Sequence, residues 1–197
     1  MTENRWIVAG LGNPGKEYEN TWHNSGYQVL DQLSDRYQFK IDQIRFSSLT
    51  FDWHIHSIAC LLLKPLTYMN KSGEAVREAA HFYRVPTERI LVIYDDIDLP
   101  FGQIRVRISG GPGTHKGMHS IVDCLKSQNF PRIRIGIGPC PNGWELADYV
   151  LSQIPENLAE EWDKVINKAA DAVVTTLSEG IEAAMRLCNN RGGIDKG

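Results

Sequence analysis

The chain has 197 residues, a length that fits one domain with a sizeable core and needs no disulfide or metal to hold it together. A formal net charge of −3 argues against a globally basic nucleic-acid binder, although the segment 103–134 carries six lysines and arginines and a single aspartate. The four cysteines are dispersed without a Cys-x-x-Cys pair, which argues against a zinc site and a disulfide framework. We find neither a leader sequence nor a long apolar run, and therefore expect a cytoplasmic protein without membrane attachment.

The first expected strand, at residues 6–11, runs into the pattern Gly10-x-Gly12-x-x-Gly15. After a strand this pattern is typical of a dinucleotide-binding turn, in which a helix begins at the last glycine. Residues 16–23 have no apolar stripe at helical spacing, so we expect the glycines to shape a rigid polar loop instead.

Asn13 lies in this loop and His23 follows it, just before a helix predicted over residues 25–37. Two strand-like segments come next, at residues 48–56 and 58–63. Side chains able to position a substrate therefore stand directly between the first strand and the first helix.

A second helix is predicted from a capping Ser72 through Tyr83, and Pro86 closes it. The continuous apolar run at residues 90–94 is typical of a strand covered on both faces, and it ends in the acidic segment 95–98. Carboxylates are thus expected at the C-terminal end of a buried strand.

Two alternating strands are predicted at residues 103–108 and 132–137, with isoleucine and valine on one face and arginine on the other. Between them lie a glycine-rich turn and a helix at about 114–126. A short helix over 144–154 and a helical end over 155–187, broken at Gly180, complete the pattern. Strands alternating with helices predict a single three-layer α/β/α domain with a mixed, mostly parallel central sheet.

Four polar side chains lie in loops or at element ends, where α/β sheets collect their sites: Asn13, His23, Asn70 and Asp95. An imidazole can take a proton from water near neutral pH, and a carboxylate can fix its tautomer, so His23 and Asp95 form a candidate pair. The amides can orient water or a carbonyl group. A hydrogen-bonded loop histidine among turn-forming asparagines remains the structural alternative.

Covalent catalysis is not favoured, because no Gly-x-Ser-x-Gly turn and no Cys beside a His partner occur. Two patterns leave a metal open as a less favoured alternative. They are the carboxylates of Asp95, Asp96 and Asp98, and His54 with His56 on one face of a strand.

Arg105 and Arg107 on one strand and Arg134 on the other are expected to share a face. Guanidinium groups match phosphate oxygens, and Lys116 near the glycine-rich turn would add a further cation. The alternative is an ordinary solvated sheet face.

Five motifs occur in one order along the chain: Gly10-Leu11-Gly12-Asn13-Pro14-Gly15 with Tyr18, Thr21-Trp22-His23-Asn24-Ser25-Gly26, Lys64-Pro65-Leu66-Thr67-Tyr68-Met69-Asn70-Lys71-Ser72-Gly73, Asp95-Asp96-Ile97-Asp98-Leu99-Pro100, and Phe130-Pro131-Arg132-Ile133-Arg134-Ile135-Gly136-Ile137-Gly138. With these motifs the chain resembles bacterial-type peptidyl-tRNA hydrolases over nearly its whole length. The resemblance implies an esterase that cuts the bond between a peptide's terminal carboxyl group and the 3′ ribose of tRNA. It also implies no cofactor and no metal, and we expect a monomer.

The resemblance further implies that His23 is the general base for water, that Asp95 supports it, and that Asn13 and Asn70 position substrate and water. The residues implied to bind substrate are Tyr18 and Met69 in the cleft and Arg105 and Arg134 at the 5′ phosphate of tRNA. We also expect Lys116 to hold a carbonyl or phosphate oxygen of the substrate. A mobile cover over the peptide channel is implied at about residues 140–154.

Two positions depart from the family pattern. Lys116 stands where an asparagine is usual, and lysine donates hydrogen bonds but accepts none. Trp22 replaces a common arginine before the histidine, and we expect an aromatic surface at the rim that can stack on a base. These departures motivate one alternative, a non-hydrolytic RNA-binding protein on the same fold. A nucleotide-dependent oxidoreductase is the third hypothesis.

Overall fold

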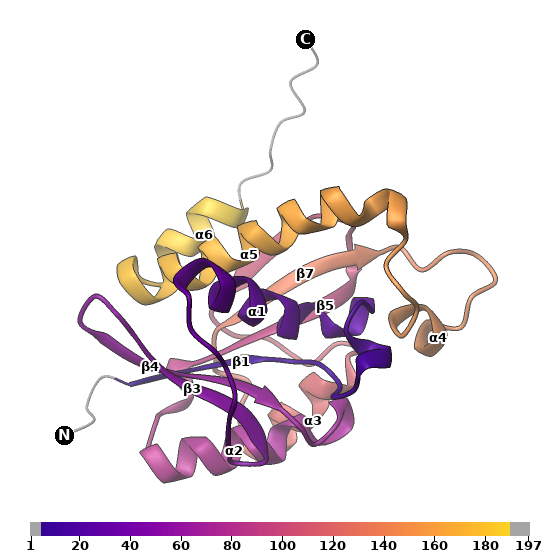
Figure 1. Ribbon diagram of the computed structural model, residues 1–197. Helices are drawn as coiled ribbons and strands as arrows, with labels where there is room; N and C mark the ends of the chain where they lie inside the picture. Colours follow the sequence, from indigo (N-terminus) through magenta and orange to yellow (C-terminus); the bar gives the residue numbers. More distant parts are fainter. Residues whose placement is uncertain (1–4, 190–197) are drawn as a thin grey trace.

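The computed structural model describes residues 5–189, which form a seven-stranded sheet with helices on both faces (Figure 1). The strands are β1 (Trp6–Gly10), β2 (Gln43–Arg45), β3 (Ser48–Ile55), β4 (Ile58–Pro65), β5 (Ile90–Pro100), β6 (Ile104–Arg107) and β7 (Arg132–Gly138). The helices are α1 (Ser25–Tyr37), α2 (Ser72–Tyr83), α3 (Lys116–Leu125), α4 (Leu146–Val150), α5 (Ala159–Glu179) and α6 (Ile181–Asn189). None of the helices in this range is long and apolar enough to cross a membrane.

The strand order is β2-β3-β4-β1-β5-β7-β6. Parallel pairing joins the four central strands β4, β1, β5 and β7, whereas β2-β3, β3-β4 and β6-β7 pair antiparallel. The predicted three-layer fold with a mixed sheet is confirmed, with parallel pairing confined to its centre.

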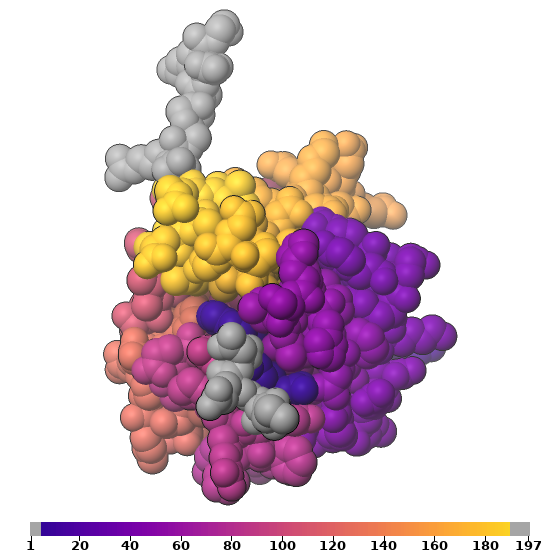
Figure 2. Space-filling model, turned by 90° about the vertical axis from the view of Figure 1, so that its left-hand side faces the viewer, coloured from indigo at the N-terminus to yellow at the C-terminus, as the bar shows by residue number. Residues whose placement is uncertain are grey.

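Each face of the sheet has its own apolar core. Val8 and Ile93 belong to the core beneath α1, α5 and α6, whereas Ile7 and Val92 belong to the core beneath α2 and α3. This alternation follows from the two-residue period of a strand. Figure 2, a side view, shows the yellow C-terminal helices above the indigo start of β1 and the magenta α2 below it.

Two glycines of the first motif permit a close approach between β1 and the start of α1. A Cβ at Gly10 would lie 2.2 Å from the carbonyl oxygen of Gly26, and a Cβ at Gly12 would lie 2.5 Å from the ring of Tyr27. Gly15 turns the chain with a φ of 118°. The glycines therefore bring His23, which lies two residues before α1, up to the end of β1.

Most predicted elements occur, with boundaries that tertiary contacts adjust. Helix α1 has the predicted bounds, but β5 runs on to Pro100 because it continues to pair with β7 beyond the apolar run. Strand β2 was not predicted, since it is a three-residue, largely exposed edge strand without an apolar pattern. Ser72 does not cap α2: it is the first helical residue, and its hydroxyl donates to the Met69 carbonyl at 2.9 Å.

Candidate active site

The polar residues predicted to cooperate meet at one edge of the sheet. Asn13 follows β1, Asn70 follows β4 and Asp95 lies in β5, three neighbouring parallel strands. Because parallel strands end at a common edge, these side chains converge there. A cavity of about 840 Å³ opens at this edge.

The cavity walls contain most of the predicted site residues: Asn13, His23, Met69, Asn70, Asp95, Lys116 and Arg134. Tyr18 and Arg105 are not among the lining residues. Tyr18 lies in the short 3₁₀ turn Lys16–Tyr18, and its main-chain carbonyl accepts from the Thr21 hydroxyl at 2.8 Å.

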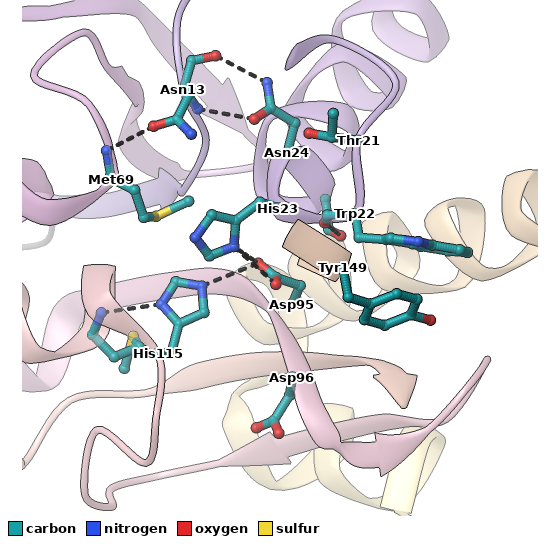
Figure 3. A network of polar contacts seen from close by, with 12 residues as sticks. Asn13, Thr21, Trp22, His23, Asn24, Met69, Asp95, Asp96, His115 and Tyr149 are labelled. Carbon is teal, nitrogen blue, oxygen red and sulfur yellow. Dashed lines mark hydrogen bonds and ion pairs between the residues drawn. The ribbon is translucent and has the colours of Figure 1, made fainter. Parts of the chain in front are cut away.

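His23 and Asp95 form a buried pair (Figure 3). The ring Nδ1 of His23 donates to the carboxylate, at 3.0 Å from Oδ1 and 2.9 Å from Oδ2. With its proton on Nδ1, the neutral ring presents an unprotonated Nε2. This is the arrangement needed for the imidazole to accept a proton from water.

A second histidine, His115, binds the same carboxylate and was not singled out from the sequence. Its Nδ1 accepts from the Met118 main-chain N–H at 3.2 Å, so its Nε2 carries the proton and donates to Asp95 Oδ1 at 3.0 Å. The only sequence signal was its place after the glycine-rich turn, where it caps α3.

The charge states of Asp95 and His115 follow from their burial and from their contact with each other. Burial alone would raise the pKa of Asp95, but His23 and His115 outweigh it and hold that pKa well below its ordinary value. Burial lowers the pKa of His115, and Asp95 opposes this only in part. The group is therefore an ionised carboxylate between two imidazoles, of which His115 is uncharged near neutral pH.

Asn13 is fixed by contacts with two segments. Its side-chain oxygen accepts from the Met69 main-chain N–H at 2.8 Å, and its main chain exchanges hydrogen bonds of 2.9 and 3.0 Å with the Asn24 side chain. Because the oxygen is occupied, the amide nitrogen of Asn13 remains as a donor on the cavity wall.

Three successive residues in the 3₁₀ turn Trp22–Asn24 point in three directions. His23 reaches Asp95 and Asn24 reaches Asn13, whereas Trp22 points away from the cavity (Figure 3). Trp22 is only 2 % exposed and packs on aromatic rings, so the expectation that it stacks on a base at the rim was wrong.

Three arginines of the basic strands, Arg107, Arg132 and Arg134, line the cavity, whereas Arg105 does not. Arg105 and Arg134 stand opposite each other in the β6-β7 register, but Arg105 turns to the end of α6, where it donates to the Asn189 carbonyl at 2.5 Å. Arg107 lines the cavity and is exposed. Arg134 lines it too, while donating to Asp96 at 2.6 Å.

The metal patterns seen in the sequence do not assemble. Asp96 turns to Arg134, away from Asp95, and His56 lies in the turn after β3 with a φ of 51°. The ligand atoms of His23, Asp95 and His115 do lie within 4.8 Å of one another. Hydrogen bonds already account for this grouping, because the His115 Nε2 proton is directed at the carboxylate.

Comparison with known proteins bears directly on this site. The family model described as peptidyl-tRNA hydrolase matches residues 7–195. The chain belongs to the peptidyl-tRNA hydrolase family. The peptidyl-tRNA hydrolase of Carboxydothermus hydrogenoformans is 47 % identical over 188 residues, covering 95 % of this chain and all of the relative. The chloroplastic peptidyl-tRNA hydrolase of Arabidopsis thaliana is 41 % identical over 97 % of this chain and 67 % of its own length.

Solved structures of peptidyl-tRNA hydrolases have the same fold. The enzyme from Acinetobacter baumannii superposes with a TM-score of 0.87 at 35 % identity, covering 96 % of this chain and 97 % of the other. A peptidyl-tRNA hydrolase in complex with N-propanol gives a TM-score of 0.88 at 34 % identity, with the same coverage.

Proposed function

We propose that this protein hydrolyses the ester bond between peptide and tRNA in peptidyl-tRNA, with His23 as the general base. The observation that carries the proposal is the hydrogen bond from Nδ1 of the cavity-lining His23 to Asp95, which leaves Nε2 without a hydrogen-bond partner among residues 5–189. Membership of the peptidyl-tRNA hydrolase family supports the substrate class.

The reaction needs one proton transfer in each direction. Nε2 of His23 takes a proton from water as the water oxygen attacks the ester carbonyl carbon. The resulting imidazolium is stabilised by the Asp95 carboxylate. When the tetrahedral intermediate collapses, the carbon–oxygen bond to the ribose breaks and the imidazolium returns the proton to the ribose oxygen.

Three polar side chains on the cavity wall are assigned to the substrate. The amide nitrogen of Asn13 donates to an acyl or peptide carbonyl, and Asn70 orients the water or the substrate. Lys116, exposed at the start of α3, donates to a carbonyl or phosphate oxygen of the substrate. Met69 forms apolar wall next to Asn13.

Arg107 and Arg134 form the proposed phosphate site, in place of Arg105 and Arg134. Both guanidinium groups line the cavity, whereas Arg105 is held at the sheet edge by Asn189. Burial would lower the pKa of Arg134, but Asp96 outweighs it and raises the pKa, so the group stays charged. A terminal phosphate of tRNA fits two such cations without any reading of sequence.

The segment at about 140–154 is proposed to be a mobile cover of a single-domain protein that acts in the cytoplasm as a monomer, without metal or cofactor. Leu146, Ala147 and Val150 line the cavity and give it an apolar wall suited to a peptide's side chains.

The test is hydrolysis of an N-blocked aminoacyl-tRNA by purified protein. The expected products are the N-blocked amino acid and tRNA with a free 3′ ribose, and His23→Asn purified in the same way controls for contaminating hydrolases. Tight tRNA binding without hydrolysis would favour the RNA-binding alternative. The burial of Trp22 removes one of the two observations that motivated that alternative.

A further inference from the structure

We infer that Tyr149 and Trp22 together position His23, so that the cover segment holds the catalytic base in place. The inference concerns a contact of this chain and rests on the proposed role of His23 as the base. Its first support is chain geometry, because Trp22 and His23 are adjacent in one 3₁₀ turn and point to opposite sides (Figure 3).

Trp22 is enclosed by three aromatic rings from three different parts of the chain. Its ring centroid lies 5.0 Å from that of Trp162 and 5.9 Å from that of Phe101, both in edge-on contact. The third ring, 6.1 Å away, is Tyr149 of helix α4. A tryptophan held on three sides has little freedom to move without its neighbours.

Tyr149 fastens the cover segment, residues 140–154, to the central sheet. Its hydroxyl donates to the Ile137 carbonyl near the end of β7 at 2.7 Å, so that residues 138–148 form a loop closed by this bond. Val150, the next residue, lines the cavity. One turn of helix therefore meets the substrate space on one side and Trp22 on the other.

The chain after α4 is fastened to the loop that leads into His23. Ile154 N–H donates to the Asn20 carbonyl at 2.8 Å, Gln153 forms an isolated bridge with Thr21, and the Gln153 amide donates to the Glu17 carbonyl at 3.0 Å. The cover and this loop thus share both backbone and aromatic contacts. A change in the position of α4 has to be transmitted to Trp22 and hence to its neighbour His23.

Asp95 holds the His23 ring from the opposite side. Within residues 5–189 the His23 ring hydrogen-bonds only to that carboxylate, and the His115 ring lies beside it with centroids 4.8 Å apart. The direction of Nε2 therefore also depends on where the turn places the Cα atom of His23. A shift of about 1 Å at Trp22 would misalign Nε2 with water, which lowers the rate without loss of the fold.

The experiment compares Tyr149→Leu with Tyr37→Leu. Tyr37 on α1 also contacts a tryptophan, Trp53, with ring centroids 5.0 Å apart, but it lies outside the cavity lining. Two quantities are measured for each protein: kcat on an N-blocked aminoacyl-tRNA, and the NMR resonance of the His23 Nδ1 proton, which reports its bond to Asp95. Melting temperatures verify that both variants fold.

Tyr149→Leu is expected to lower kcat about tenfold or more and to shift or broaden the His23 Nδ1 proton resonance. Tyr37→Leu should leave both unchanged. Tyr149→Phe retains the ring on Trp22 and should recover most of kcat and the resonance position.

An unchanged His23 resonance in Tyr149→Leu would overturn the inference, whether or not kcat falls. Because the resonance is read without substrate, this result is separable from a failure of the proposed function, which would appear as absence of hydrolysis by the wild-type protein.

Discussion

Asp95 and His115 are joined by a 3.0 Å hydrogen bond in which the ring Nε2 donates to Oδ1, the oxygen that also lies 3.0 Å from His23 Nδ1. One carboxylate therefore orients the proposed base and is itself oriented by a second imidazole. His115 is in turn fixed by the Met118 main-chain N–H at the start of α3. The base is thereby tied to the helix that also carries Lys116.

The shared carboxylate makes Asp95→Asn a sensitive variant. An amide puts an N–H₂ group in place of one of the two oxygens that face His23 Nδ1, and it no longer stabilises an imidazolium with a negative charge. We expect kcat to fall at least about a hundredfold, with KM changed little. Asp31→Asn is the control, since Asp31 bonds Lys64 instead. Equal kcat values for the two variants would contradict the account.

The state of His115 predicts how stability depends on pH. Its folded pKa is lowered below the ordinary 6.5, so below that pH the unfolded chain binds a proton that the folded protein does not. The free energy of unfolding should therefore decrease as the pH falls from about 7 toward the folded pKa.

His115→Gln keeps a donor for Asp95 and does not titrate, so it should flatten this dependence. Urea denaturation at several pH values measures how steeply the free energy of unfolding changes with pH for each protein. Parallel slopes in the wild type and the variant would show that His115 titrates normally in the fold.

Arg107→Ala should raise KM for the tRNA substrate by about tenfold with little effect on kcat, because it removes a phosphate contact that is made in both the ground state and the transition state. The slope of the logarithm of the tRNA binding constant against the logarithm of the salt concentration should become shallower by about one. Arg105→Ala is the matched control and should have a clearly smaller effect, since its guanidinium is held by Asn189. A larger rise of KM in Arg105→Ala than in Arg107→Ala would show that Arg105 belongs to the phosphate site.

Lys116→Asn should retain or raise turnover, because the neighbouring amides and imidazoles form a site in which a neutral donor and acceptor can also orient substrate. Steady-state kinetics with an N-blocked aminoacyl-tRNA compare kcat of Lys116→Asn with that of the wild type. A loss of about a hundredfold would mean that the lysine charge contributes to the transition state in its own right.

The pairing of His23 with Asp95 could be predicted from the sequence because strand ends converge in a parallel sheet. Asp95 follows an apolar run, His23 follows the polar loop that leaves the first strand, and β1 and β5 are neighbours in the sheet. Helix α1 likewise matched its apolar spacing.

The choice between Arg105 and Arg107 could not be made from the sequence. The two-residue period of a strand puts both on one face, and the register places them opposite Arg134 and Arg132. The difference between them comes from Asn189, which lies more than eighty residues later in the chain. Its side-chain oxygen accepts from the main-chain N–H of Val106 at the open edge of β6, and its carbonyl accepts from Arg105.

The burial of Trp22 could not be predicted either, because adjacency to His23 suggested a place at the site. A 3₁₀ turn rotates successive side chains by about 120°, so neighbours in sequence point to different surroundings. The rings that enclose Trp22 come from α4, α5 and the loop after β5, which no local pattern reveals.

The most direct test of the central claim is the single-turnover rate of His23→Ala on an N-blocked aminoacyl-tRNA, with tRNA affinity measured on the same preparation. The account predicts a rate reduced by about a thousandfold or more and a dissociation constant within about threefold of the wild type, since the base acts in the chemical step and Arg107 and Arg134 bind the phosphate. Hydrolysis at the wild-type rate by His23→Ala would contradict it.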